Sequence, residues 1–170
     1  GRQVVHDNLD LEVRPGEVIG VVGGSGAGKS VLLRTIVGLN PDEAGPGYKH
    51  FIIRPQPGGG LAWAKGEYHS LHGPIACSWK LADGRLTIDI TVPPNTRATL
   101  YVPAADPASV TESGRPAAQA EGVTPLGMKD GAAKYDVAAG RYQFGAPDSD
   151  AIEGEGAGSN LPSNTVTADQ

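Results

Sequence analysis

The chain has 170 residues, a formal net charge of −5 and abundant glycine (25) and proline (14). This composition suits short strands and many turns better than long helices, and the length allows one domain with a fragment attached. A single cysteine, Cys77, excludes an intrachain disulfide and a thiolate metal cluster. No apolar run approaches the roughly 20 residues of a membrane span, so we expect no direct membrane insertion.

The charges are unevenly distributed along the chain. Residues 1–147 hold all 14 Lys and Arg and 14 of the 19 Asp and Glu, so this part is neutral. Non-specific binding to nucleic acid needs a net basic face, and we therefore expect no nucleic-acid partner. The other acids lie in residues 148–170, a polar stretch with almost nothing to bury, which predicts a disordered tail.

Residues 1–45 have the pattern of an α/β fragment. The stretch VVHDNLDLEV alternates as a half-buried strand does, and EVIGVVG is a β-branched run typical of a strand covered on both faces. After a glycine-rich loop, apolar residues recur at roughly helical spacing from Lys29 to Leu39, and Pro41 marks the stop. We predict a small strand–loop–helix unit.

The loop between this strand and helix, GGSGAGKS, matches the phosphate-binding pattern G-x-x-x-x-G-K-[ST]. Its glycines let consecutive backbone N–H groups surround phosphate oxygens at the positive end of the helix. Lys29 would bridge the terminal phosphates, and Ser30 would bind Mg²⁺ only when a nucleotide is bound. The predicted ligand site consists of Gly23, Gly24, Ser25, Gly26, Ala27, Gly28, Lys29 and Ser30.

The residues HDNLDLEVRPGEVIGVVGGSGAGKSVLLRTIVGL resemble the start of an ATP-binding cassette (ABC) transporter ATPase, most closely the bacterial lipid-trafficking branch. The resemblance covers residues 1–45 and implies ATP with Mg²⁺ as the ligand, with contacts at residues 23–30 and Val31. If the ABC-like segment determines where the protein acts, the resemblance implies a cytoplasmic location; otherwise the location stays open.

The same resemblance implies catalytic parts that the chain lacks. Hydrolysis needs a strand-end Asp for magnesium (Walker B), a water-polarising acid and a switch glutamine, and the family adds an LSGGQ-type signature and a histidine switch. The nearest strand-end acid, Asp89, falls on the solvent face of a predicted antiparallel strand. Because positioning and electrostatics supply most of phosphoryl-transfer catalysis, we expect no ATPase activity and no required cofactor.

In residues 46–147 the apolar residues recur at every second position, the period of a β-strand. Ile75, Cys77, Trp79 and Leu81 share one face, as do Leu86, Ile88, Ile90 and Val92, and ATLYV (98–102) repeats the alternation. Asp83-Gly84, Asp130-Gly131 and Gly140 are hairpin signals. The fold class predicted is mainly β: an antiparallel β-sandwich of about seven or eight strands, preceded by the small α/β fragment.

Four stretches of this second segment resemble the C-terminal β-sandwich of bacterial α-L-rhamnosidases: PGYKHFIIRP (46–55), the Gly-Glu-Tyr…Ser-x-His-Gly run (66–73), VPPNTRATLYVPA (92–104) and DGAAKYDVAAGRYQF (130–144). The resemblance covers residues 46–146. In that family an acidic pair in a preceding helical barrel inverts the anomeric centre, and no such barrel is present here. The resemblance therefore implies a non-catalytic domain whose partner is a glycosidase catalytic domain.

Several residues allow two interpretations. Glu67, His69 and His72 form E-x-H-x-x-H, but on strand or loop backbone this spacing favours hydrogen-bonded turn histidines over a metal site. Trp79 and Cys77 share the apolar face, which favours the core over a sugar platform or reactive thiol. Trp63 follows a glycine run and is expected to be more open than Trp79, with weak carbohydrate contact as the alternative to a plain surface position.

The two resemblances meet near Pro41–Gly47, which indicates a chimera of 1–45 (partial ABC-type segment), 46–147 (sandwich) and 148–170 (acidic tail). We expect a non-catalytic accessory sandwich of a rhamnosidase-like hydrolase fused to an incomplete ABC ATPase segment, with at most residual nucleotide-phosphate binding. The alternative is an ATP-binding protein of an ABC transporter that uses the Walker A loop.

Overall fold

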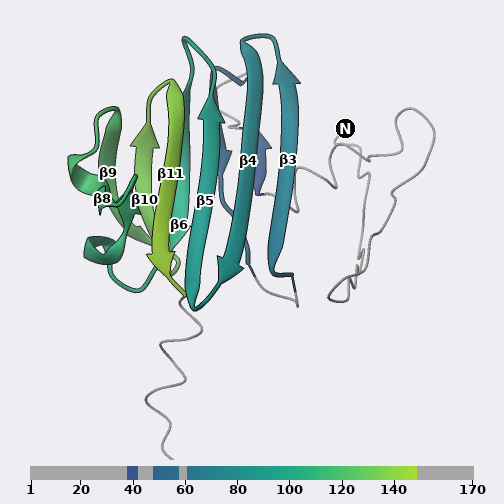
Figure 1. Ribbon diagram of the computed structural model, residues 1–170. Coiled ribbons are helices and arrows are strands. Elements are labelled where there is room, and N and C mark those ends of the chain that lie inside the picture. The colour runs from purple at the N-terminus through teal and green to yellow at the C-terminus, as the bar shows by residue number, and fades with distance from the viewer. Residues whose placement is uncertain (1–37, 42–47, 58–60, 149–170) are drawn as a thin grey trace, which may run out of the picture.

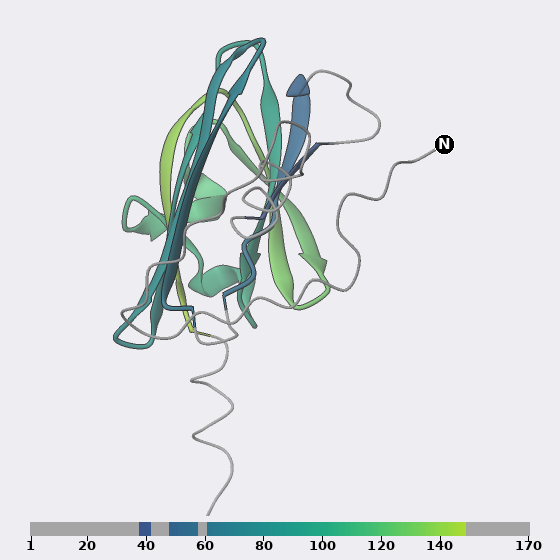
Figure 2. The same cartoon turned by 90° about the vertical axis from the view of Figure 1, so that its right-hand side faces the viewer.

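The computed structural model describes residues 38–41, 48–57 and 61–148, which form two facing sheets (Figures 1 and 2). The five-stranded sheet has the order β1 (Leu39–Pro41), β2 (His50–Ile53), β6 (Arg97–Pro103), β10 (Ala132–Val137), β9 (Val123–Lys129). The six-stranded sheet has the order β3 (Trp63–Ser70), β4 (Gly73–Ala82), β5 (Arg85–Val92), β11 (Gly140–Pro147), β7 (Thr111–Glu112), β8 (Arg115–Pro116).

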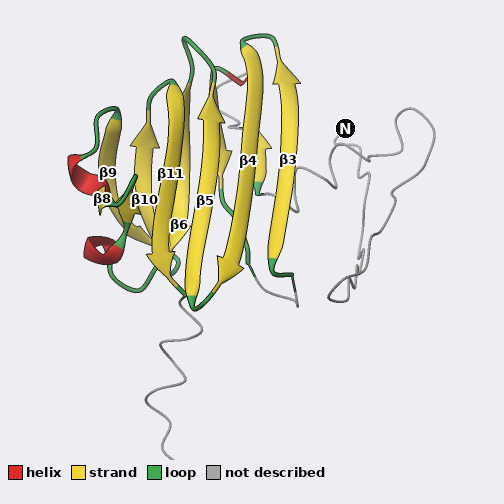
Figure 3. Cartoon of the chain, viewed as in Figure 1, coloured by secondary structure: helices red, strands yellow, loops and turns green. Residues whose placement is uncertain are grey.

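The predicted mainly β sandwich is confirmed, and Figure 3 shows the predominance of strands. Short 3-10 turns include η2 (Pro107–Ser109) and η3 (Ala117–Gln119), of three residues each. The strands in these residues outnumber the seven or eight predicted, since β1 lies before the expected sandwich and β7 and β8 have only two residues each.

The apolar side chains that alternate along β4 and β5 point between the sheets. Trp79 lies opposite Ile88 in the β4–β5 register, and both are buried. The facing sheet supplies Phe51, Leu100 and Tyr135 to the same core. Removing this apolar surface from water is the main force that holds the two layers together.

Three tight hairpins follow from local turn chemistry. Asp83-Gly84 and Asp130-Gly131, both predicted, have positive φ at both positions, as a type I′ turn requires. Ser113-Gly114 joins β7 to β8 in the same way and was not predicted. The hairpin predicted at Gly140 is wrong, because β10 and β11 lie in different sheets. A local turn signal marks a change of direction but does not identify the sheet that the next strand joins.

The first strand corrects the predicted helix end. Leu39, expected on the helix face, lies in β1 opposite Ile53 of β2 and is 1% exposed. The backbone N–H of Arg54 donates to the carbonyl oxygen of Gly38 at 2.7 Å, which extends this pairing. A single apolar position at the end of a periodic stretch fits a helix or a strand equally well, and here packing on the sandwich decides. The rest of the predicted helix, residues 29–37, lies outside the described residues.

Tyr142 packs over two glycines where the chain passes between sheets. A Cβ added at Gly122, whose φ is +74°, would lie 2.5 Å from the Tyr142 hydroxyl oxygen. We expect Gly122→Ala to lower the free energy of unfolding by about 2 kcal/mol, from left-handed backbone strain and steric overlap. Urea unfolding measures this effect.

The double variant Gly122→Ala/Tyr142→Phe is the control, because it removes the overlapping hydroxyl and leaves Ala138 Cβ as the next neighbour, at 3.5 Å. We expect Gly122→Ala to lower the free energy of unfolding about half as much in the Tyr142→Phe background as in the unmodified chain. Strictly additive effects would show that the hydroxyl is not the obstacle.

Candidate functional site

The phosphate-binding loop predicted at residues 23–30, with Ser30 as its magnesium ligand, lies outside the described residues, as does most of the acidic tail. Both stay predictions. The surfaces that the structure does place are the outer faces of the two sheets and the turn between β3 and β4.

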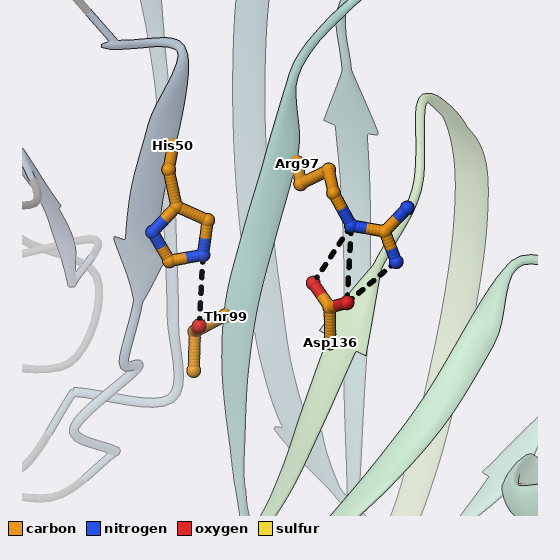
Figure 4. Close-up of polar contacts among 4 residues, drawn as sticks. All are labelled: His50, Arg97, Thr99 and Asp136. Carbon is orange, nitrogen blue, oxygen red and sulfur yellow. Dashed lines mark hydrogen bonds and ion pairs between the residues drawn. The ribbon is translucent and has the colours of Figure 1, made fainter. Parts of the chain in front are cut away.

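The outer face of the five-stranded sheet carries an ordered polar arrangement (Figure 4). Arg97 Nε donates to Asp136 Oδ1 at 3.2 Å and Oδ2 at 3.0 Å, and Nη2 also donates to Oδ2. The hydrogen bonds to Asp136 raise the pKa of Arg97 above its ordinary value. Beside this pair, His50 Nε2 lies 3.1 Å from Thr99 Oγ1. Adjacent strands β2, β6 and β10 supply these groups, so the arrangement joins strands across the sheet.

Tyr101 lies further along the same face beneath two cations. The Arg54 guanidinium lies 5.1 Å and the Lys134 ammonium 5.7 Å from its ring centroid. Arg54 also pairs with Asp130 at 3.3 Å. These long side chains cover Tyr101 on the outward side of β6, so the strand is buried on both faces. The alternation predicted for ATLYV is confirmed, because Ala98, Leu100 and Val102 join the core while Tyr101 lies on the outer face.

The outer face of the six-stranded sheet is hollowed. A shallow groove of about 390 Å³ is lined by polar side chains from four strands, among them Lys65, Ser78, Asp89, Thr91, Arg141 and Gln143. Asp89 is exposed, as predicted, and accepts a hydrogen bond from Gln143 Nε2 at 2.9 Å. Both neighbours of β5, β4 and β11, are antiparallel to it, so Asp89 projects from an antiparallel strand, as the sequence predicted.

The E-x-H-x-x-H residues are separated by the β3–β4 turn. His69 Nε2 lies 3.0 Å from Glu67 Oε1 on β3, and both side chains are exposed. His72 lies in the turn, where its backbone N–H donates to Ser70 Oγ at 3.1 Å. Within the described ranges, no group of three His, Cys, Asp or Glu side chains could hold a metal ion.

The two tryptophans have opposite environments. Trp79 is 2% exposed, which confirms its core assignment, whereas Trp63 is 66% exposed at the start of edge strand β3. The more open setting expected for Trp63 is confirmed, because β3 turns this side chain to the outer face of the sheet, and its contact with carbohydrate stays a prediction.

Cys77 is buried in the core, as predicted. Burial, reinforced by the negative charge of Asp89, raises the pKa of its thiol from 9.0 to about 12. Between these values the unfolded chain loses the thiol proton and the folded chain keeps it, so this group's contribution to stability falls as pH rises from about 9 to about 12. It is fully present below pH 9.

We expect Cys77 to resist an aromatic disulfide reagent at pH 8 in the folded protein and to react fully in denaturant. Absorbance of the released thiolate follows the reaction. Cys77→Ala should show a shallower decline of stability with pH in this window, which separates the thiol from the tyrosines that also titrate there. A native thiol that reacts as fast as the denatured one would contradict the burial.

Comparisons with known proteins divide the chain in two. The family model for the bacterial alpha-L-rhamnosidase C-terminal domain matches residues 38–116, and that for ABC transporters matches residues 6–48. An alpha-L-rhamnosidase of Streptomyces avermitilis is 35% identical over 66% of this chain and 10% of its own length. The crystal structure of an enzyme of that name and species, complexed with L-rhamnose, has a TM-score of 0.61 and 30% identity over 71% of this chain and 11% of its own.

The structure of an alpha-L-rhamnosidase from Dictyoglumus thermophilum shares the fold, with a TM-score of 0.58 at 23% identity over 72% of this chain and 14% of its own. The first segment resembles an aliphatic sulfonates import ATP-binding protein of Streptomyces avermitilis, 56% identical over 26% of this chain and 17% of that protein. It also resembles a zinc import ATP-binding protein of Anaplasma phagocytophilum, 42% identical over 32% of this chain and 22% of that protein.

The chain therefore joins a segment similar to ABC transporter ATPases to one similar to the rhamnosidase C-terminal domain, as the sequence indicated. It spans about a tenth of its rhamnosidase relative. The two family models overlap at residues 38–48, where β1 begins. The ATP-binding relatives carry names from several transport systems, so the lipid-trafficking branch stays a prediction.

Proposed function

We propose that the chain is a non-catalytic accessory sandwich of a rhamnosidase-like glycoside hydrolase, fused to an incomplete ABC ATPase segment. The observation that carries this proposal is the match of the described fold to the C-terminal domain of the rhamnosidase relatives. The domain limits 1–45, 46–147 and 148–170 are part of the proposal, with residues 38–41 also contributing to the sandwich.

The acidic side chains support a non-catalytic role. Inverting hydrolysis needs a general acid and a general base facing one another across the sugar, roughly 6.5–9.5 Å apart. Asp89 is the single carboxylate that lines the outer groove. A second hollow, of about 230 Å³, is lined by Asp130 and Asp148, but Asp130 is paired with Arg54. Other acids bind local partners, as Glu67, Asp106, Glu112 and Asp136 do.

A glycosidase catalytic domain is the proposed partner of the sandwich. An enzyme without its own C-terminal sandwich should regain activity or thermal stability when residues 36–148 of this chain are fused in its place. A fusion that folds but leaves the barrel as unstable as the truncated enzyme would contradict the accessory role.

The ABC-like segment adds at most residual binding of nucleotide phosphates, and ATP with Mg²⁺ is the ligand that its motif would take. A cytoplasmic location follows if this segment decides where the protein acts. In the part of the chain that the structure describes, no helix is both long and apolar enough to cross a bilayer. The second candidate function is ATP binding within an ABC transporter, favoured by the match at residues 6–48.

One titration separates the two candidates. We expect a fluorescent ATP analogue, with and without Mg²⁺, to show no saturable binding at micromolar concentration and Lys29→Ala to behave like the unmodified chain. Micromolar binding that Lys29→Ala abolishes would favour the second candidate. Release of phosphate from ATP or of nitrophenol from an aryl rhamnoside would contradict the absence of enzyme activity.

A further inference from the structure

The groove on the outer face of the six-stranded sheet has a regular floor. The strand register places Lys65 (β3) opposite Ser78 (β4), Ser78 opposite Asp89 (β5), and Asp89 opposite Gln143 (β11). Four hydrogen-bonding side chains thus form one row across four strands, a span of about 14 Å at the usual strand spacing. The next outward row contains Glu67, Ala76, Thr91 and Arg141. In the first row Lys65 donates, Asp89 accepts, and Ser78 and Gln143 can do both, which suits hydroxyl groups that donate and accept.

Two of the three charged side chains that line the groove are cations. Lys65 and Arg141 line it and form no ion pair with any described residue, whereas Asp89, its one carboxylate, accepts from Gln143 at 2.9 Å. Two further carboxylates lie near the groove without lining it: Glu67 contacts His69, and Glu112 accepts from Ser113 Oγ at 2.8 Å. Two cations without partners therefore face the groove, and they complement an anionic group on a ligand.

Trp63 gives this face an exposed ring. It lies two residues from Lys65 on β3, on the same side of the strand, and is 66% exposed. The register places Lys80 of β4 beside Trp63, followed in the same row by Thr87 of β5 and Gly145 of β11. A flat aromatic surface beside a shallow polar groove suits a ligand with one apolar and one hydroxylated face, which is the character of a pyranose ring.

We propose that the outer face of the six-stranded sheet binds an oligosaccharide that carries a carboxylate, such as a chain containing uronic acid. Trp63 stacks on one sugar ring, Ser78, Asp89 and Gln143 bind hydroxyl groups, and Lys65 and Arg141 bind the carboxylate. A phosphate polymer fits less well, because Asp89 lies at the centre of the groove and residues 1–147 have no net positive charge. This proposal does not depend on the accessory role, since it concerns the surface of the described sandwich alone.

Titration of the full chain with a trimer of galacturonic acid tests the proposal, with a neutral galactose trimer of the same linkage as the reference. By calorimetry at about 20 mM salt we expect saturable binding at least about fivefold tighter for the acidic trimer, and loss of that preference at about 500 mM salt. The indole N–H resonance of Trp63 should shift, while that of buried Trp79 stays in place.

Variants on exposed positions assign the contacts. Lys65→Ala, Arg141→Ala and Trp63→Ala should each weaken binding of the acidic trimer by about fivefold or more. Lys129→Ala removes the same charge from exposed edge strand β9 of the other sheet and should leave binding unchanged. Circular dichroism confirms that each variant is folded.

Three outcomes would overturn the proposal: no saturable binding of either trimer, equal affinity for both, or a loss in Lys129→Ala equal to that in Lys65→Ala. Equal affinity for the two trimers would leave the groove without a role for its cations. None of these results would bear on ATP binding or on the fusion experiment, so failure here is distinguishable from failure of the proposed function.

Discussion

Replacing Gly38 with alanine is expected to lower the free energy of unfolding of the sandwich by about 3 kcal/mol. Gly38 has a φ of +78°, and a Cβ there would lie 2.0 Å from the carbonyl oxygen of Arg54. That oxygen is backbone next to the β1–β2 pairing, so it cannot move aside without breaking the hydrogen bond from Arg54 N–H to Gly38 O. The expected result is that β1 leaves the sheet and exposes Phe51 and Ile53.

Gly114→Ala is the matched control. Gly114 also has a φ of +78°, but nothing lies within 4 Å of its added Cβ, so its substitution costs only the left-handed strain of about 1 kcal/mol. The difference between the two variants in urea unfolding isolates the contact with Arg54. Equal effects would mean that residues 38–41 do not pair with β2 in solution and that the junction belongs to the ABC-like segment alone.

The core at Trp79 gives the second large effect. Truncation by Trp79→Ala should lower the free energy of unfolding by about 4 kcal/mol, because it removes the largest fully buried side chain and leaves a cavity between the sheets. Thermal and urea unfolding measure the loss. For a domain of this size the loss is a large share of the total stability.

Trp79→Phe should cost only about 1 kcal/mol, which is the informative comparison. The indole Nε1 is buried and has no hydrogen-bond partner in the structure. A buried donor without a partner costs about 1–3 kcal/mol, so removing it offsets part of the lost volume. If Trp79→Phe were as damaging as Trp79→Ala, the indole would have an acceptor, and the packing around β4 would differ from that described.

Much of the sandwich could be predicted from local patterns. The period of two in residues 75–81 and 86–92 identified two strands and their inward faces, and Asp83-Gly84 identified the turn between them. These predictions succeed because a type I′ turn and an amphipathic strand depend on neighbouring residues alone. The inward face of ATLYV follows the same pattern, but the burial of its outward side could not be predicted, because Arg54 and Lys134, distant in sequence, cover Tyr101.

The two candidate sites differ in how they can be recognised. The phosphate-binding loop at residues 23–30 is a contiguous motif, so the sequence predicts it without a fold. The outer groove draws on β3, β4, β5 and β11, and its polar residues are indistinguishable in sequence from ordinary solvent-facing positions. The sequence singled out Trp63, Asp89 and Glu67 on this face, but each for a separate reason and not as parts of one surface.

Local sequence patterns were enough to predict the strand faces, two of the hairpins and the join between two unrelated resemblances. Tertiary structure alone decided that Leu39 forms a strand, that β2 pairs in parallel with β6, and that β10 and β11 separate into different sheets. Alternation specifies which side of a strand is apolar but not which strand lies beside it. Partners are chosen when distant segments close a common core, and that choice places Lys65, Asp89 and Gln143 in one row.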